Sequence, residues 1–408
     1  MPVLLLMPKK VRAPYRSYKS SDFSKENSDD LGQDEDDDKS SNKSAGVLSK
    51  CTLWPVSKFE KINVLNCALQ DGEPKVQSGS MHNLVVFPIE IFIKIFEILE
   101  HSGELKPKFM RVCKLFYQII LPMIYRAPHL RATNFFKFVE TLSNNKRLGH
   151  YIYSLDLAYV NQSGKNAFVA RLLKQSKAHL ESFVAPQTSF GFGPLIALKN
   201  CQNLKILDLR LVSETSSIEI NDYQEISWPA GLTFLRLSGG IDDDFPFHSN
   251  LPSSITSLEF AHCPSITDFG LKQFLNKIGA NLKSFKVQYP MPGLKGNTLD
   301  DVFHLCPNLR VLEVYVDYLS STFFDESLFG GVDYSKCLRT LYINSSGSLG
   351  TSNRLDPIDL AIALEDGRFP LLKNVQCTAK LGWNPKSESV RYIAEELDER
   401  NGGLYIGY

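Results

Sequence analysis

The chain has 408 residues, which is enough for more than one folded unit. Its 45 basic and 45 acidic residues give a formal net charge of zero, which argues against wholesale binding of nucleic acid. Its eight cysteines show no CxxC spacing, which favours reduced thiols over a disulfide framework and predicts a cytoplasmic or nuclear location. No segment is long and apolar enough to predict a membrane span.

Residues 1–82 are predicted to form a largely disordered tail. The run SSDFSKENSDDLGQDEDDDKSSNKS is acidic and rich in serine, so it offers too little apolar surface to offset the entropy of folding. The basic residues before this run and the scattered apolar residues after it have two interpretations. They are either short docking motifs or parts of a solvated tail.

The first predicted helix covers residues 87–99, FPIEIFIKIFEIL. These residues alternate as in a strand, but on a helix four polar side chains fall within an arc of about 60°. They are Glu90, Lys94, Glu97 and His101. Pro88 suits the start of a helix, and the Ser102-Gly103 pair suits its end. The rest of the circumference is apolar, which predicts burial on two sides and therefore a second surface that covers the helix.

A second helix is predicted to begin at Pro107 and to end at Pro122. Its apolar side chains form one stripe, made of Phe109, Val112, Cys113, Phe116 and Ile120. Residues 83–130 are therefore predicted to form a compact set of short helices. Such a set is too small to be comfortably stable alone.

The order of motifs in residues 83–130 resembles an F-box. The matching positions are Phe87, Pro88 and Glu90 in the opening, the Ile95-Phe96 pair, Val112-Cys113-Lys114, Phe116-Tyr117, and the fungal-type tail from Leu121 to Arg126. Phe87 stands where leucine is more common. The alternative interpretation of this segment is an ordinary helical cap on the next domain.

The resemblance implies a partner for the first helix. F-boxes dock on the adaptor subunit of SCF-type cullin-RING ubiquitin ligases, and apolar surface is buried between the two proteins. Carried over to this sequence, the expected adaptor-binding residues are Phe87, Pro88, Ile91, Phe92, Ile95, Phe96, Val112, Cys113, Phe116 and Tyr125.

Residues 131–408 are predicted to form a leucine-rich-repeat domain with a C-terminal cap. A motif with apolar residues at positions 1, 4 and 6 recurs nine times, at intervals of 23–34 residues; about 20–29 is usual for such repeats. Its first positions are Ile152, Leu180, Leu204, Leu232, Ile255, Leu282, Leu309, Leu338 and Leu372. The motif predicts one parallel strand per repeat on a concave face. Convex helices are expected at residues 167–178, 299–305 and 358–364 and from 266 onward.

The predicted fold class is therefore α/β, with all-α F-box helices capping a leucine-rich-repeat solenoid that has one parallel sheet. Position 5 of the repeats carries charges of alternating sign at Asp208, Arg236, Glu259, Lys286 and Glu313. These charges form either a docking strip for a target protein or a self-neutralising ladder across the sheet. In the second case, recognition would favour tyrosines near the C-terminal repeats. The candidate target-binding residues are Arg236, Lys286, Tyr315 and Tyr342.

The sequence shows no constellation of residues that carries catalysis or binds a metal. The eight histidines lack metal-ligand spacing. The glycine-rich residues 191–194 and the acidic residues 242–244 are predicted to be a turn and a solvated loop between repeats. We therefore expect no cofactor and no enzymatic activity in this chain itself.

The expected function is that of the substrate-recognition subunit of an SCF-type ubiquitin ligase. The F-box would bind the adaptor, which joins it to the cullin scaffold, and the repeats would bind an unidentified protein target. One alternative is a leucine-rich-repeat scaffold or regulator with a helical cap and no connection to a ligase. Another is an F-box protein of a non-degradative assembly. A scaffold would bury the helix at residues 87–99 within the chain, whereas an F-box would leave it exposed.

Overall fold

The computed structural model describes residues 87–160, 166–186, 192–211, 224–288, 291–325, 337–347 and 355–407. These residues belong to one unit, which spans His82–Tyr408. The tail predicted for residues 1–82, with its candidate docking motifs, lies outside the described residues.

The described part of the chain begins with the helices of the predicted F-box. They are α2 at Ile89–His101, the 3₁₀ turn η4 at Pro107–Arg111 and α3 at Lys114–Arg126. Helix α2 ends at His101 and is capped by Ser102, and Gly103 follows with a φ of 73°, a left-handed conformation that glycine adopts at little cost. The helical interpretation of residues 87–99 is therefore confirmed.

The predicted end of the second helix at Pro122 is wrong, because α3 continues through this proline for another turn. Proline lacks the N–H that would bond to the carbonyl four residues earlier, which here belongs to Gln118. Gln118 lies at an exposed position, and Ile120 and Tyr125 on either side of Pro122 pack into the protein. This packing outweighs the lost hydrogen bond.

Two elements join the F-box helices to the first repeat: helix α4 at Phe135–Asn144 and the 3₁₀ turn η5 at Lys146–Tyr151. Helix α4 buries one side, formed by Phe135, Val139 and Leu142. The ring of Tyr125 in α3 stacks on Phe138 in α4 with centroids 5.9 Å apart. The carbonyl of Arg126 accepts a hydrogen bond of 2.9 Å from the backbone N–H of Tyr153. Helix α3 is therefore tied to the start of the repeats.

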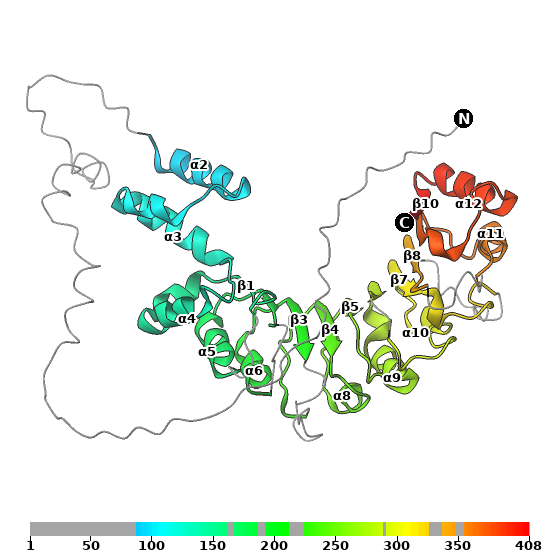
Figure 1. The fold of residues 1–408 in the computed structure, drawn as a ribbon, viewed down its shortest axis with the longest axis horizontal. Coiled ribbons are helices and arrows are strands. Elements are labelled where there is room, and N and C mark those ends of the chain that lie inside the picture. The colour runs from blue at the N-terminus through cyan, green and yellow to red at the C-terminus, as the bar shows by residue number, and fades with distance from the viewer. Residues whose placement is uncertain are drawn as a thin grey trace, which may run out of the picture. The chain divides into compact units, whose positions relative to one another are not determined.

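The ten strands that the structure describes form one parallel sheet in chain order (Figure 1). They are β1 Ser154–Asp156, β2 Ser182–Val184, β3 Ile206–Leu211, β4 Phe234–Gly239, β5 Ser257–Phe260, β6 Ser284–Val287, β7 Val311–Tyr315, β8 Thr340–Asn344, β9 Asn374–Thr378 and β10 Gly403–Gly407. Position 4 of each predicted motif pairs with position 4 of the next, from Leu155 with Phe183 to Leu341 with Val375. The predicted leucine-rich-repeat solenoid is confirmed.

Short helices return the chain from one strand to the next on the other side of the sheet. They include α5 Asn166–Ser176, α6 Phe192–Ala197, α8 Asp244–His248, α9 Asp268–Ile278, α10 Val302–Leu305 and α11 Pro357–Glu365. The helices predicted at residues 167–178, 358–364 and from 266 onward are present, whereas the one predicted at 299–305 is a single turn. Helix α9 begins where the Thr267 hydroxyl accepts a hydrogen bond from the backbone N–H of Phe269.

The C-terminal end of the solenoid contains a strand that the sequence analysis did not predict. Helix α12 at Glu388–Glu399 is followed by β10, which pairs in parallel with β9. Leu404 and Ile406 stand in register with positions 4 and 6 of the ninth motif. Position 1 is Asn401, which adopts a φ of 58°, so the apolar motif is incomplete in this repeat.

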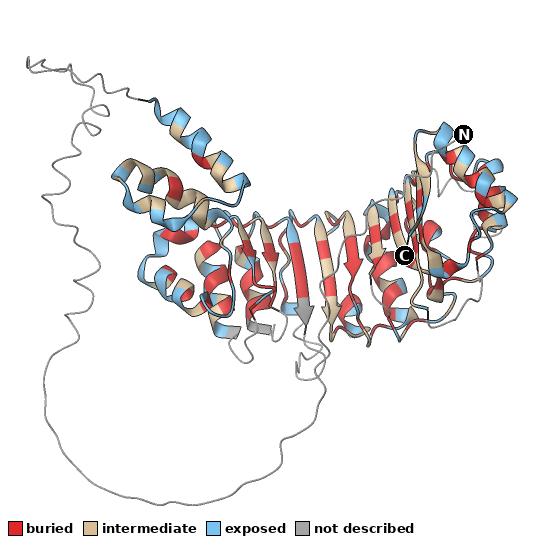
Figure 2. Ribbon diagram, turned by 45° about the horizontal axis from the view of Figure 1, so that its top comes forward, coloured by how far each residue is buried: buried red, intermediate tan, exposed pale blue. Residues whose placement is uncertain are grey.

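The hydrophobic core lies between the sheet and the helices behind it. Every residue at positions 1, 4 and 6 of the nine motifs is at most 2% exposed. Figure 2 shows the resulting buried residues along the strands, and it shows helix α2 largely exposed. Each repeat completes its core against its neighbours, so three apolar positions in each motif are enough to form the strand side of the core.

Candidate protein-interaction sites

Helix α2 presents an apolar face that no other part of the described chain buries. Ile91, Ile95 and Ile98 lie within about 60° of one another around the helix. Their exposed fractions are 44%, 45% and 61%, and Phe87, just before the helix, is 54% exposed. We call Phe87, Ile91, Ile95 and Ile98 the α2 apolar face. A continuous apolar surface on an exposed helix is typical of a protein-binding site.

The opposite side of α2 packs on α3. The Phe116 ring of α3 lies 5.4 Å from the ring of Phe92 and 4.8 Å from that of Phe96, measured between centroids. Phe96 is only 3% exposed. These three predicted adaptor-binding residues therefore hold the two helices together and so position the α2 apolar face. Their direct contact with an adaptor stays a prediction.

The remaining predicted adaptor-binding residues have different surroundings. The thiol of Cys113 caps α3 by accepting a hydrogen bond from the backbone N–H of Phe116 at 3.5 Å. Val112, directly before it, is 54% exposed. Tyr125 stacks on Phe138 of α4, and burial, with a smaller contribution from Tyr117, raises the pKa of its hydroxyl. Pro88 directly precedes α2.

Sequence reasoning missed four exposed large hydrophobic residues of this region, which are Ile89, Ile93, Ile98 and Tyr117. Ile98 was left out of the predicted adaptor-binding residues although it shares the helical face of Ile91 and Ile95, so its spacing alone could have identified it. Tyr117 is 46% exposed on α3 and belongs to the F-box motif, but it was not assigned a role.

The five alternating charges of position 5 stand side by side across strands β3 to β7. The guanidinium of Arg236 lies 3.1 Å from an oxygen of Glu259 and 3.5 Å from an oxygen of Asp208. The amine of Lys286 lies 3.8 Å from Glu313. The interpretation as a self-neutralising ladder is confirmed. A target that docked on Arg236 or Lys286 would have to displace these pairs.

Burial sets the electrostatics at the centre of the ladder. Asp208 and Glu259 are each 6% exposed. Burial raises the pKa of the Glu259 carboxyl, and the neighbouring charges of Arg236 and Lys286 oppose this effect without cancelling it. Arg236 also donates a hydrogen bond of 3.1 Å to the side-chain oxygen of Gln288. These contacts favour a structural role for the middle of the sheet surface.

Tyrosines continue the position-5 row toward the C-terminus. Tyr342 pairs in register with Glu313 on one side and with Gln376 on the other, and Tyr405 of β10 follows Gln376. Tyr405 is 48% exposed and was missed because the tenth strand was not predicted. Tyr315, by contrast, is tied down, because its hydroxyl donates a hydrogen bond of 2.5 Å to the carbonyl of Gln288.

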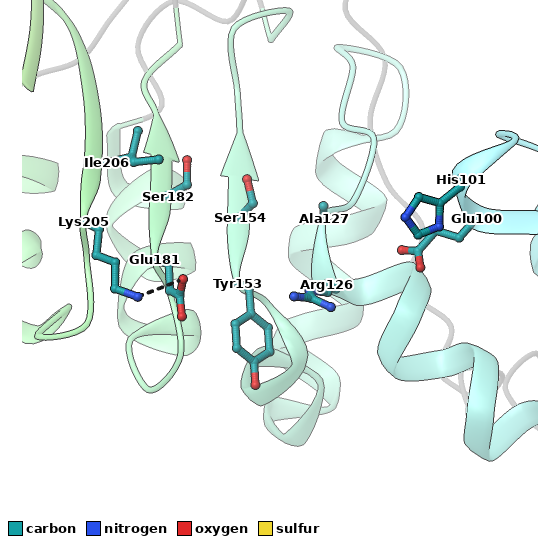
Figure 3. A pocket seen from close by; sticks show the side chains of 10 residues that line it. All are labelled: Glu100, His101, Arg126, Ala127, Tyr153, Ser154, Glu181, Ser182, Lys205 and Ile206. Carbon is teal, nitrogen blue, oxygen red and sulfur yellow. Dashed lines mark ion pairs between the residues drawn. The ribbon is translucent and has the colours of Figure 1, made fainter. Parts of the chain in front are cut away.

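A groove lies where the C-terminal end of α2 approaches the first three strands (Figure 3). Glu100 and His101 line it from α2, and residues at the starts of β1 to β3 line its other side. The guanidinium of Arg126 lies 5.4 Å from the ring centroid of Tyr153, which is a cation–π contact. The groove lies between the end of α2 and the starts of β1 to β3, so its lining residues show which edge of the sheet α2 approaches.

The described residues contain no group of three histidine, cysteine, aspartate or glutamate side chains able to hold a metal ion. Burial raises the pKa of the thiols of Cys263, Cys306 and Cys377 to about 12, and that of Cys201 to about 11. These four thiols are therefore protonated at neutral pH and are poor nucleophiles and poor metal ligands. Within the described ranges, no helix is long and apolar enough to cross a membrane.

Comparison with known proteins agrees with this geometry. Residues 84–163 match the family described as the COS11 F-box domain. The chain is 43% identical over 326 residues to the F-box protein YDR306C of Saccharomyces cerevisiae, covering 74% of this chain and 68% of that protein. It is 35% identical over 349 residues to the protein pof5 of Schizosaccharomyces pombe, covering 78% of this chain and 98% of that protein. The chain belongs to the F-box protein family.

Solved structures resemble this F-box protein only distantly. The complex of Rad7 and Elc1 in yeast matches with a TM-score of 0.40 and 14% identity, covering 82% of this chain and 87% of that chain. The leucine-rich-repeat-containing protein LegL7 of Legionella pneumophila matches with a TM-score of 0.37 and 18% identity, covering 67% of this chain and 96% of that chain. F-box proteins generally act as receptor subunits rather than as enzymes.

Proposed function

We propose that this F-box protein is the substrate-recognition subunit of an SCF-type ubiquitin ligase. The observation that carries the proposal is the α2 apolar face. It lies in the F-box, and no other part of the described chain covers it. A plain leucine-rich-repeat scaffold with a helical cap would have no reason to keep this face in water. Membership of the F-box protein family supports the same conclusion.

The energetics of the α2 apolar face favour a stable partner. Complete burial of an aliphatic or aromatic side chain contributes about 1.5–3 kcal/mol. The four residues of the face are each roughly half exposed in the free chain. Their burial against an adaptor would therefore contribute on the order of 3–5 kcal/mol, which corresponds to about two to three orders of magnitude in affinity.

The leucine-rich repeats would supply the other half of the receptor. Their ten described strands present a continuous surface, and target recognition is expected away from the neutralised ladder, with the exposed Tyr405 and the partly buried Tyr342 as anchors. The adaptor would join the chain to a cullin scaffold, and ubiquitin transfer would be carried out by other subunits. We expect this assembly in the cytosol or the nucleus.

Affinity purification of the tagged full-length chain, followed by identification of the proteins that copurify, tests the proposal. We expect the ligase adaptor and the cullin to be recovered with the wild-type chain and to be lost from a variant with Ile91→Ala and Ile95→Ala. Recovery of target proteins by both chains would show that the repeats remain folded. Absence of the adaptor from the wild-type sample would contradict the proposal. If the adaptor is recovered but the turnover of a copurifying target does not depend on this chain, the assembly is non-degradative.

A further inference from the structure

A second row of side chains crosses the sheet directly before the strands, at position 2 of the motif. Its members are linked through the backbone: the N–H of Arg310 donates to the carbonyl of Lys283, that of Arg339 to Arg310, and that of Lys373 to Arg339, at 2.8–3.0 Å. These four residues therefore stand side by side, each directly before one of the neighbouring strands β6 to β9. We call Lys283, Arg310, Arg339 and Lys373 the basic rim.

All four side chains of the basic rim are exposed, and none forms an ion pair within the part of the chain that the structure describes. The next position on each strand offers no neutralising charge, because it is occupied by Ser284, Val311, Thr340 and Asn374. The nearby carboxylate of Glu313 is already engaged, since it accepts a hydrogen bond from Asn344 and pairs with Lys286. The basic rim is thus a line of four uncompensated positive charges.

The position-5 ladder provides a comparison within the same sheet. There, neighbouring strands carry opposite charges, whereas in the basic rim neighbouring strands, whose backbones lie about 4.8 Å apart, carry like charges. Like charges on adjacent strands are destabilising, and this spacing is shorter than the Debye length of about 8 Å at physiological salt. Folding alone gives no reason for such a row. A local rule that is broken without a structural gain is typical of a functional surface.

We propose that the basic rim binds an acidic, Asp- and Glu-rich segment of the target protein. The row is about 14 Å long if neighbouring strands lie about 4.8 Å apart, a length that an extended peptide of four or five residues spans at about 3.3 Å per residue. Four charges in a single line are few for a nucleic-acid site, since a DNA-binding protein commonly neutralises about 6–10 phosphates. A carboxylate-rich peptide fits the length and charge of the rim better.

The same row places this site relative to the F-box. Its members in the first three repeats are Tyr153, Glu181 and Lys205, which line the groove beside the end of α2 (Figure 3). Lys205 is neutralised there, because its amine lies 3.3 Å from Glu181. The uncompensated charge is therefore confined to the C-terminal half of the row. A peptide bound to the basic rim would lie along the edge of the sheet that the F-box helices approach.

This inference deepens the proposed function, because it names the chemistry of the target segment, but the binding itself does not require the adaptor. The test uses the purified full-length chain and a short fluorescent peptide rich in Asp and Glu, with fluorescence anisotropy as the readout. Lys283→Glu combined with Arg339→Glu places opposite charges on neighbouring strands of the rim. We expect this variant to lose at least about tenfold in affinity for the peptide at physiological salt while its melting temperature stays the same or rises.

The matched control is Lys174→Glu combined with Lys386→Glu, which changes the net charge equally at exposed sites away from the basic rim. The control should bind the peptide within about twofold of the wild type, and a peptide with Asn and Gln in place of Asp and Glu should bind no variant. Equal loss in the control and rim variants, or equal binding of both peptides by the wild type, would overturn the inference. Tighter binding of a single-stranded oligonucleotide than of the acidic peptide would also overturn it. Adaptor binding is measured on the same samples and should be the same for the wild type, the rim variant and the control. If the wild type does not bind the adaptor, the proposed function is wrong, whatever the result with the peptide.

Discussion

The guanidinium of Arg236 on β4 lies 3.1 Å from the carboxylate of Glu259 on β5, and both side chains are largely buried in the outward-facing row of the sheet. Asp208 flanks the same guanidinium on the other side at 3.5 Å. The positive charge of Arg236 on β4 therefore compensates two nearly buried carboxylates, Asp208 on β3 and Glu259 on β5. Its removal would leave both without their main compensating charge.

Arg236→Ala should lower the free energy of unfolding of the solenoid by about 2–4 kcal/mol, because breaking a buried ion pair leaves an uncompensated charge. The matched change Lys286→Ala should cost less, since the Lys286 amine is 3.8 Å from Glu313 and its side chain is 31% exposed. Urea denaturation of both variants measures the difference. A cost for Arg236→Ala equal to or below that of Lys286→Ala would show that the ladder does not stabilise the sheet as described.

The raised pKa of Glu259 predicts a dependence of stability on pH. Because the pKa in the folded state exceeds the unfolded value of about 4.3, the folded state binds more protons between the two values. This group therefore stabilises the fold less and less as the pH rises through that window. Glu259→Gln removes the titration, so its stability relative to the wild type should increase as the pH rises from about 4 through the folded-state pKa of Glu259. Urea titrations across this range would contradict the assignment if the relative stability decreased.

Leu258 tests the core of the repeats without touching the F-box. Its side chain is completely buried and pairs in register with Leu235 and Phe285 on the two neighbouring strands. Leu258→Ala should leave a cavity and cost about 2–5 kcal/mol of solenoid stability. Adaptor affinity should be unchanged. A melting curve and an adaptor-binding measurement on the same sample check both statements, and a loss of adaptor binding in the folded variant would contradict the separation of the two sites.

Phe96 distinguishes residues that position the α2 apolar face from those that form it. Phe96→Ala removes the ring that packs on Phe116, which should cost about 3–5 kcal/mol locally. Hydrogen exchange should show faster exchange of the α2 amides, while strands β5 to β8 keep their protection. Unchanged protection of α2 would mean that this ring contact does not hold the helix.

The sequence analysis predicted the strands well because positions 1, 4 and 6 carry the whole core of each repeat. The tenth strand was not predicted because its position 1 is the polar residue Asn401. The end of the second helix at Pro122 was predicted wrongly for another reason, because the tertiary packing of its neighbours is not visible in a local pattern. The alternating charges of the ladder were recognised from spacing, since the register of a parallel sheet follows directly from the repeat.

The candidate site was less predictable than the fold. The F-box motif identified the helix that carries the exposed apolar face, but it did not separate the exposed Ile91 and Ile95 from the buried Phe96, because all three are apolar and lie within two turns. Which side of α2 packs on α3 depends on the position of a second helix in space. The basic rim is visible in the sequence at position 2 of four successive motifs, but its charges gain meaning only once the structure shows that no carboxylate among the described residues forms an ion pair with them.

The central claim is that the α2 apolar face binds the ligase adaptor, and the affinity of the purified full-length chain for the purified adaptor tests it most directly. Phe87→Ala, Ile91→Ala and Ile95→Ala combined should weaken binding by about one and a half to three orders of magnitude, since about 2–4 kcal/mol of burial is lost. Alanine is a strong helix former, so α2 should remain folded. The control, Lys94→Ala with Glu97→Ala, removes an exposed ion pair from the polar side of the same helix and should bind like the wild type. Wild-type affinity in the triple variant, with helicity retained, would contradict the claim.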